Sequence, residues 1–272
     1  MLQLKPQIGY TERTRGQFGN FLFQYNLLLQ LSWNFGFECF MKTEKYLLDI
    51  NDSFLTKRNI NSHINKVTLD RKILAEFDWD ISSLVSEKIV KKGKSIILPT
   101  GIYGESFFTV TKINPNFFMQ IPGIANNKLS NAVKVGIHVR GNDFKFWNEK
   151  ATPDFEFYLR AINEIKVELG SEYQIEYRIF TDDHHSEIVE KLKKHFKLKI
   201  EKSSYFEDFI ALSGMDFIVA PPSTFSIWAG ILGKSKTVYF EKNWINYSLE
   251  RKDRFWVELN ENSNKYFKFK KI

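Results

Sequence analysis

Cysteine is almost absent from this chain, which has a single one, Cys39, in 272 residues. One thiol excludes an intramolecular disulfide and also excludes the zinc sites that several cysteines build. Long apolar runs are absent as well: the longest candidate, Phe21 to Phe35, is interrupted by polar residues and falls short of the roughly 18 apolar residues of a membrane span. The sequence does not open with the charged and apolar regions of a secretory signal peptide. We therefore expect a cytoplasmic protein.

The common nucleotide-binding motifs are also missing. Gly-Lys-Ser occurs at 93–95 and at 233–235, but neither copy has the preceding glycine of a phosphate-binding loop, and Gly-x-Gly-x-x-Gly does not occur. The segment Asp78-Trp79-Asp80 resembles a metal-holding acidic pair, yet its apolar neighbours favour the surface of a helix. We therefore expect no metal site.

The net charge of +7 fits an anionic partner without pointing to nucleic acid. The lysines fall in dispersed pieces, Lys91–Lys94, Lys191–Lys199 and Lys265–Lys271, which we interpret as solvated surface. No basic stripe is interleaved with aromatic residues, as it is in nucleic-acid-binding modules. The sequence therefore predicts no nucleic-acid partner.

The second half of the chain contains a regular alternation of strands and helices. Short β-branched or apolar runs predict strands at 133–139, 173–180, 198–200, 217–220 and 237–240. Apolar residues at helical spacing predict helices that open near residues 152, 206 and 225. A further helix is predicted from the helical spacing of Ile188, Val189, Leu192 and Phe196, with His184 and His185 in its solvated first turn. Such alternation predicts an α/β fold in which helices cover both faces of a parallel sheet.

Polar residues directly follow several of these strands, namely Arg140, Asp182 and Asp183, and Ser223 and Thr224. Because the carboxyl ends of parallel strands share one edge, these residues should converge where open α/β sheets bind ligands. A guanidinium offers a planar fork to phosphate, and a helix that opens at Ser223 offers free N–H groups to an anion. Two interpretations of Arg140 stay open, a phosphate ligand or one half of a surface Arg–Asp pair. Ser223 is a simple helix cap, a phosphate ligand, or both.

The first half contains one clear feature, the glycine-bracketed segment Arg15-Gly-Gln-Phe-Gly-Asn20. Gly16 and Gly19 permit a close backbone approach to a ligand, and Asn20 is a natural N-cap for a buried apolar helix over 21–34. Residues 126–131 are polar, as is typical of a linker. The sequence thus predicts two domains, residues 1–130 and residues 131–272.

Four blocks of the sequence together resemble the α-1,2-fucosyltransferase family. Arg15-Gly-Gln-Phe-Gly-Asn-Phe-Leu-Phe-Gln-Tyr25 resembles the Gly-x-x-Gly-Asn-Gln-x-Phe-Gln-Tyr signature, and His138-Val-Arg-Gly-Asn-Asp143 resembles His-x-Arg-Arg-Gly-Asp. Phe180-Thr-Asp-Asp183 is similar to Phe-Ser-Asp-Asp, and Ser223-Thr-Phe-Ser-Ile-Trp228 to Ser-Thr-Phe-Ser-Trp-Trp. The blocks stand in family order. The chain departs from the motif at Gly141, where the family has a second arginine, although related protein O-fucosyltransferases carry only one.

The resemblance implies a GT-B-like fold, that is, two facing Rossmann-like domains with the active site in the cleft. Residues 1–130 would form the acceptor side, and residues 131–272 would bind the GDP-sugar. The implied reaction transfers fucose from GDP-fucose to a galactose-like residue of a glycan or glycolipid, with inversion and without a metal or another cofactor. Peripheral association with the inner membrane surface is compatible with such an acceptor. Two alternatives stay open: another GDP-sugar as donor on the same fold, or a non-catalytic protein that binds nucleotides or polyanions.

The resemblance also implies roles for individual residues. Its donor-binding residues map onto His138, Arg140, Asp182, Asp183, Ser223, Thr224, Phe225, Gly16, Phe18 and Gly19. Arg140 would hold the pyrophosphate, and the loop from Gly16 to Asn20 would face the sugar, with Arg140 and Asn20 as catalytic candidates. Transfer to a hydroxyl is helped by a general base, for which Asp143 and Glu149 are the candidates. Asp143 is equally suited to a salt bridge that orients Arg140.

Overall fold

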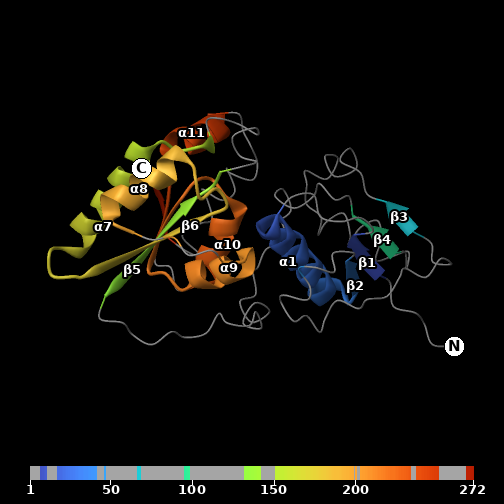
Figure 1. Cartoon of the computed structure of the whole chain (residues 1–272). Coiled ribbons are helices and arrows are strands. Elements are labelled where there is room, and N and C mark those ends of the chain that lie inside the picture. The colour runs from blue at the N-terminus through green and yellow to red at the C-terminus, as the bar shows by residue number, and fades with distance from the viewer. Residues whose placement is uncertain are drawn as a thin grey trace. The chain divides into compact units, whose positions relative to one another are not determined.

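The computed structural model describes residues 7–10, 17–41, 46, 66–68, 95–98, 132–141, 151–198, 200, 203–233, 237–250 and 268–272. The chain divides into two compact units, Met1–Pro122 and Gly123–Ile272, and each unit contains a parallel sheet (Figure 1). The α/β class with parallel sheets is therefore confirmed. The functional division into an acceptor side and a GDP-sugar side at residue 130 stays a prediction.

The N-terminal unit is built on four short strands in the order β2-β1-β4-β3. These are β1 (Gln7–Tyr10), β2 (Glu38–Met41), β3 (Lys66–Thr68) and β4 (Ser95–Ile97). Every described pairing between them is parallel. The helix α1 (Phe18–Phe35) connects β1 to β2. β1 lies between β2 and β4, so its carboxyl end lies where the neighbouring strands diverge in chain order.

The start of α1 differs from the prediction. The helix begins at Phe18, with Gln17 at the N-cap position and no side-chain capping bond, so the prediction that Asn20 caps it was wrong. Asn20 and Gly19 lie inside the first turn rather than in a loop. The physical reason is packing: Phe18 is buried and its ring lies 5.9 Å from that of Phe21 and 5.5 Å from that of Tyr46. Burial of this aromatic side chain outweighs the local preference of asparagine for a cap.

The C-terminal unit contains five strands in the order β6-β5-β7-β8-β9, all paired in parallel. The strands are β5 (Val133–Val139), β6 (Ile175–Thr181), β7 (Phe217–Ala220), β8 (Thr237–Phe240) and β9 (Lys268–Lys271). The helices are α7 (Phe155–Leu169), α8 (Glu187–Phe196), α9 (Tyr205–Ser213), α10 (Thr224–Leu232) and α11 (Lys242–Glu250). Among the described residues, no helix is long and apolar enough to cross a membrane.

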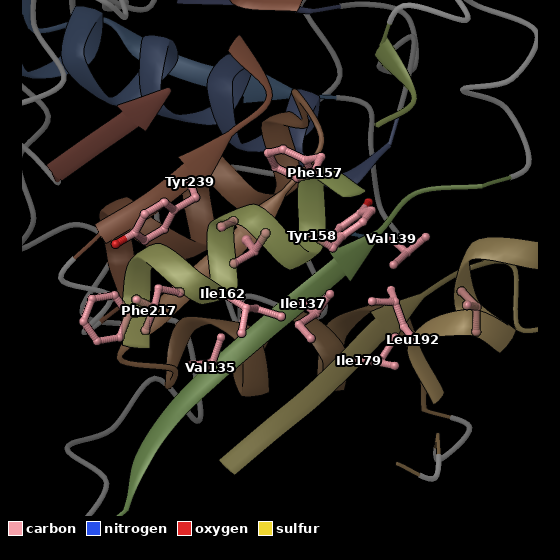
Figure 2. Packing of buried hydrophobic residues seen from close by; sticks show 14 residues of the cluster. Val135, Ile137, Val139, Phe157, Tyr158, Ile162, Ile179, Leu192, Phe217 and Tyr239 are labelled. Carbon is pink, nitrogen blue, oxygen red and sulfur yellow. The ribbon is translucent and has the colours of Figure 1, made fainter. Parts of the chain in front are cut away.

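The side chains of β5 alternate between two helical layers. Val135, Ile137 and Val139 belong to the apolar cluster that α7 and α8 cover, as Figure 2 shows for Tyr158 and Ile162 of α7. The intervening positions face the opposite layer, which contains α9 and α10 (Figure 1). At one of them, Gly136, an added Cβ would lie 2.7 Å from Cδ1 of Leu212, so the side chains that α9 packs against β5 would have to shift to admit a larger residue. The sheet is therefore buried on both faces, as the near-continuous apolar strands predict.

Two predictions about this unit were wrong, and one strand was not predicted. The helix α8 begins at Glu187, so His184 and His185 precede it and do not form its first turn. Leu198 and Ile200 are not in a strand; they pack against the apolar cluster after the left-handed turn at Lys197, whose φ is 54°. Conversely, the C-terminal lysines interpreted as solvated surface include the fifth strand, β9. Lys270 donates to a carboxylate oxygen of Glu168 at 2.6 Å and to the hydroxyl of Tyr239 at 3.3 Å. The sequence of this segment is only weakly typical of a strand. Pairing with β8 and the hydrogen bonds of Lys270 stabilise the strand conformation.

Candidate functional site

The order of the strands in the C-terminal unit creates one switch point, between β5 and β7. The chain leaves β5 and returns through α7 to β6 on one side, whereas β7 lies on the other side of β5. The segments that follow β5 and β7 therefore diverge, and ligands of open α/β sheets bind at the carboxyl edge of such a point. Arg140 and Gly141 follow β5, and Pro221 to Ser223 follow β7 and lead into α10. Arg140 is half-buried there.

His138, two residues before Arg140, connects β5 to helices on both faces of the sheet. Its side chain is 6% exposed, and its Nδ1 lies 2.5 Å from Oγ of Ser226 in α10. The hydroxyl of Tyr158 in α7 donates to its backbone carbonyl at 3.3 Å. Its ring lies 5.5 Å from that of Phe225. Burial, with the charge of Arg140 as a second cause, lowers the pKa of His138 to about 3, so the imidazole is neutral at physiological pH.

Ser223 occupies the N-cap position of α10, but its hydroxyl does not cap the helix. The side chain is 2% exposed, and Oγ is buried without a hydrogen-bond partner. An unsatisfied buried hydroxyl carries a free-energy cost, which a ligand that hydrogen-bonds to it would remove. The first turn of α10 contains no acidic residue that would neutralise the positive end of the helix. The interpretation of Ser223 as a simple cap is therefore contradicted, while the N-terminus of α10 remains suited to an anion.

Thr224 and Phe225 continue the first turn of α10 in different environments. Thr224 is half-buried, whereas Phe225 is 9% exposed. The ring of Phe225 lies 5.2 Å from that of Phe209 in α9, in addition to its contact with His138. Phe225 therefore packs the start of α10 against β5 and α9. These ring contacts hold the N-terminus of α10 in place.

The turns after β5 and β6 are held together through Gly141. Its backbone N–H donates to Oδ1 of Asp182 at 2.9 Å, and the N–H of Asp183 donates to Oγ1 of Thr181 at 3.0 Å. An added Cβ at Gly141 would lie 2.2 Å from Cβ of Asp183, so any larger residue would displace this turn. Here the chain departs from the second arginine of the family motif for a steric reason. Arg140 is consequently the single arginine of the turn.

Sequence reasoning missed three residues of this region. Ser226 and Tyr158 hold His138, and nothing in their local pattern predicts contacts with a residue 88 and 20 positions away, respectively. The third is Asp208 in the first turns of α9, which accepts a hydrogen bond from the hydroxyl of Ser203. Burial raises the pKa of Asp208, although the Ser203 bond and the charges of Arg178 and His184 act in the opposite direction. Because α9 leads into β7, its N-terminus lies toward the same carboxyl edge as Arg140.

The remaining predicted residues fall into two groups. Asp143, Glu149 and Gly16 lie outside the described residues. Phe18, Gly19 and Asn20 belong to the first turn of α1 in the N-terminal unit, where Phe18 and Gly19 are buried and Asn20 is half-buried. Their participation in the site stays a prediction. In the part of the chain that the structure describes, no three His, Cys, Asp or Glu residues are grouped so that they could hold a metal ion.

Comparison with known proteins identifies the family. A family model described as "Glycosyl transferase family 11" matches residues 111–260, which is more than half of the chain. The match contains the strand ends after β5, β6 and β7 but not α1. No curated protein and no solved structure matched the chain. The resemblance found in the sequence is thereby confirmed, and the chain belongs to glycosyl transferase family 11, the family of the α-1,2-fucosyltransferases.

Proposed function

We propose that this protein transfers L-fucose from GDP-β-L-fucose to a hydroxyl of a glycan, with α-1,2 linkage to a galactose-like residue and with inversion. The proposal rests on two groups at the switch point between β5 and β7. One is the guanidinium of Arg140, and the other is the hydroxyl of Ser223. Ser223 offers a buried hydroxyl without a protein partner at the N-terminus of α10, beside the strand whose end carries Arg140. This combination suits the diphosphate of a nucleotide-sugar donor.

The chemistry assigned to the site is stabilisation of the leaving group. When the bond between the sugar and the β-phosphate breaks, negative charge builds on the phosphate oxygens. A guanidinium and the N-terminus of α10 are preorganised to stabilise that charge. The neutral imidazole of His138 adds no second cation, so Arg140 supplies the positive charge. These groups do the work that a metal ion does in other transferases, which is why we propose a reaction without a metal or another cofactor.

Asp208 supports a guanine base in particular. The Watson–Crick edge of guanine presents N–H groups, which require an acceptor, and a half-buried carboxylate at the same edge of the sheet can accept them. Adenine and uracil do not offer the same pair of donors. We therefore propose Asp208 as the base-recognising residue, with Asp182 and Asp183 near the nucleotide.

The acceptor side belongs to the N-terminal unit in this proposal. Asn20, Phe18 and the glycines at 16 and 19 would face the sugar from a GT-B-type cleft between two Rossmann-like domains. Asp143 or Glu149 would remove the proton of the acceptor hydroxyl. We further propose that the acceptor is a glycan or glycolipid. The protein would act in the cytoplasm, in peripheral contact with the membrane surface.

A thermal-shift panel tests the nucleotide specificity. GDP, GDP-fucose, GDP-mannose, IDP, UDP and ADP are compared, each with and without EDTA, because a ligand of the native state raises the melting temperature by mass action. We expect the guanine nucleotides to give the largest shifts and EDTA to leave them unchanged. Equal shifts from all nucleotides would contradict guanine recognition, and loss of the shifts with EDTA would contradict independence of metal.

A transfer assay separates the proposal from its two alternatives. GDP-fucose and GDP-mannose are incubated with galactose-terminated oligosaccharides, and products are identified by mass spectrometry and linkage analysis. A fucosylated product with an α-1,2 linkage supports the proposal. A product from GDP-mannose alone would identify another GDP-sugar transferase, and nucleotide binding without any product or donor hydrolysis would indicate a non-catalytic nucleotide-binding protein.

A further inference from the structure

The contacts of His138 lie directly behind the two groups that the proposed donor site needs. His138 precedes Arg140 by two residues, which is about 7 Å along a strand. Ser226 follows Ser223 by three residues, which is about one turn along a helix. The 2.5 Å contact between the His138 ring and the Ser226 hydroxyl therefore joins β5 to α10 immediately below both groups. Neither side chain has more than a few per cent of its surface exposed.

The opposite face of the sheet contributes a second contact with the same residue. The hydroxyl of Tyr158 donates to the carbonyl of His138, and the Tyr158 side chain is 1% exposed. The end of β5 is thus held from α7 through its backbone and from α10 through its side chain. Rotation or translation of this strand end against α10 would break at least one of these buried bonds, and a buried polar group without a partner is costly.

We infer that Ser226 and Tyr158 are positioning residues of the donor site: through His138, they hold Arg140 and the N-terminus of α10 at one spacing. This inference rests on the proposed function, because it takes the diphosphate as the ligand that spans the two groups. Neither residue touches the donor. A diphosphate bridges Arg140 and Ser223 only if the distance between them is preserved, so loosening either contact weakens donor binding without removing a ligand group.

The test compares two substitutions with two matched controls. Ser226→Ala and Tyr158→Phe each remove one hydroxyl from the His138 contacts. Ser213→Ala removes an equally buried serine hydroxyl, which donates to Ile210 within α9, and Tyr239→Phe removes a buried tyrosine hydroxyl that bonds Glu168. The dissociation constant of GDP is measured by calorimetry at a temperature at which every variant is folded. We expect Ser226→Ala and Tyr158→Phe to weaken GDP binding about threefold to tenfold, and both controls to stay within about twofold of wild type.

A spectroscopic readout distinguishes positioning from general loosening of the fold. The ring nitrogens of His138, observed by ¹⁵N NMR, should shift in Ser226→Ala and stay unchanged in Ser213→Ala, even if both variants lose stability. If Ser226→Ala does not fold, Tyr158→Phe carries the affinity comparison.

The outcomes distinguish failure of the positioning inference from failure of the proposed function. Wild type that binds GDP, with Ser226→Ala and Tyr158→Phe that bind it equally well, would overturn the positioning inference alone. Controls that weaken GDP binding as much as the two test variants would overturn it as well, because general loosening would then explain the effect. Wild type that does not bind GDP, while the His138 resonances still respond to Ser226→Ala, would overturn the proposed function and, with it, the inference built on it.

Discussion

Arg140 stands at the first position after β5, one residue beyond the last pair with β6. If Arg140 binds the diphosphate, its planar guanidinium contributes two parallel hydrogen bonds in addition to its charge. We therefore predict that Arg140→Ala loses most GDP affinity and all activity, and that Arg140→Lys fails nearly as badly. The loss should be on the order of 2–4 kcal/mol, larger in the transition state than in the bound ground state.

Calorimetry with GDP and steady-state kinetics measure the two parts of that prediction. Arg160→Ala, which removes an exposed arginine from α7, is the control and should behave as wild type. An Arg140→Lys variant within about threefold of wild type would mean that a point charge is enough, and Arg140 would then not be the diphosphate clamp.

His138 makes stability depend on pH in a direction that follows from its burial. Its pKa is lowered from 6.5 to about 3, so the unfolded chain binds more protons than the folded chain between these values. The free energy of unfolding therefore falls as the pH drops below about 6.5, by about 2 kcal/mol from this group between pH 7.5 and 5. We predict that between pH 7.5 and 5 the free energy of unfolding of His138→Gln falls by about 2 kcal/mol less than that of the wild type. Urea unfolding at both pH values measures it, and parallel losses in the two proteins would show that His138 does not titrate in this way.

At the scale of elements, the helix N-termini of the C-terminal unit fall into two kinds. Asp154, Ser186 and Ser204 each accept a backbone N–H within the first turn of α7, α8 and α9, respectively. Asp154 thus takes the capping position that the sequence had placed near Thr152. Ser223 accepts no such bond at α10. The carboxylate of Glu241 likewise accepts the N–H of Trp244 at the start of α11. Four of the five described helices of this unit thus have a side-chain acceptor at the N-terminus, whereas the Ser223 hydroxyl at α10 makes no such bond.

We predict opposite effects for two serine substitutions. Ser204→Ala should cost about 1 kcal/mol of stability because it removes a capping box, and it should leave GDP binding unchanged. Ser223→Ala should leave stability within about 0.5 kcal/mol of wild type, or raise it, while weakening GDP binding about threefold to tenfold. Chemical unfolding and calorimetry on the same preparations check both. A Ser223→Ala variant that loses stability as Ser204→Ala does, and keeps its GDP affinity, would make Ser223 an ordinary cap.

At the scale of the whole molecule, the predicted site residues are divided between two units. Arg140 and Ser223 belong to the C-terminal unit, and Asn20 belongs to the first turn of α1 in the N-terminal unit. In the proposed mechanism the nucleotide is held by the C-terminal unit alone, and the other unit acts when donor and acceptor are both bound. We predict that Asn20→Ala lowers kcat and leaves the dissociation constant of GDP nearly unchanged.

The structure simplifies the Asn20 experiment because Asn20 is not the N-cap of α1. Its substitution is therefore not expected to carry the cost of a lost capping bond. Arg160→Ala, at an exposed position of α7 outside the predicted site, is the control and should keep wild-type turnover. Folded Asn20→Ala with wild-type kcat would remove Asn20 from the active site and leave the role of α1 resting on family resemblance.

The family, the α/β class and most of the C-terminal strands were determined by the sequence itself. β5, β7 and β8 were predicted with their observed bounds because each is a short run rich in apolar or β-branched residues within a sheet that is covered on both faces. The placement of Arg140, Asp182 and Ser223 followed from the same local pattern, since each stands just after a strand. Sequence periodicity is a local signal, and these are local features.

Only the tertiary structure decided the features that depend on distant residues. The start of α1 depends on where Phe18 packs, and β9 depends on pairing with β8. The contact of His138 with Ser226 joins residues 88 positions apart, and the bond from Gly141 to Asp182 joins residues 41 apart. A pattern of neighbouring residues contains no information on which side chain arrives from such a distance, nor on whether a hydroxyl such as that of Ser223 finds a partner. Those outcomes are determined when the layers pack.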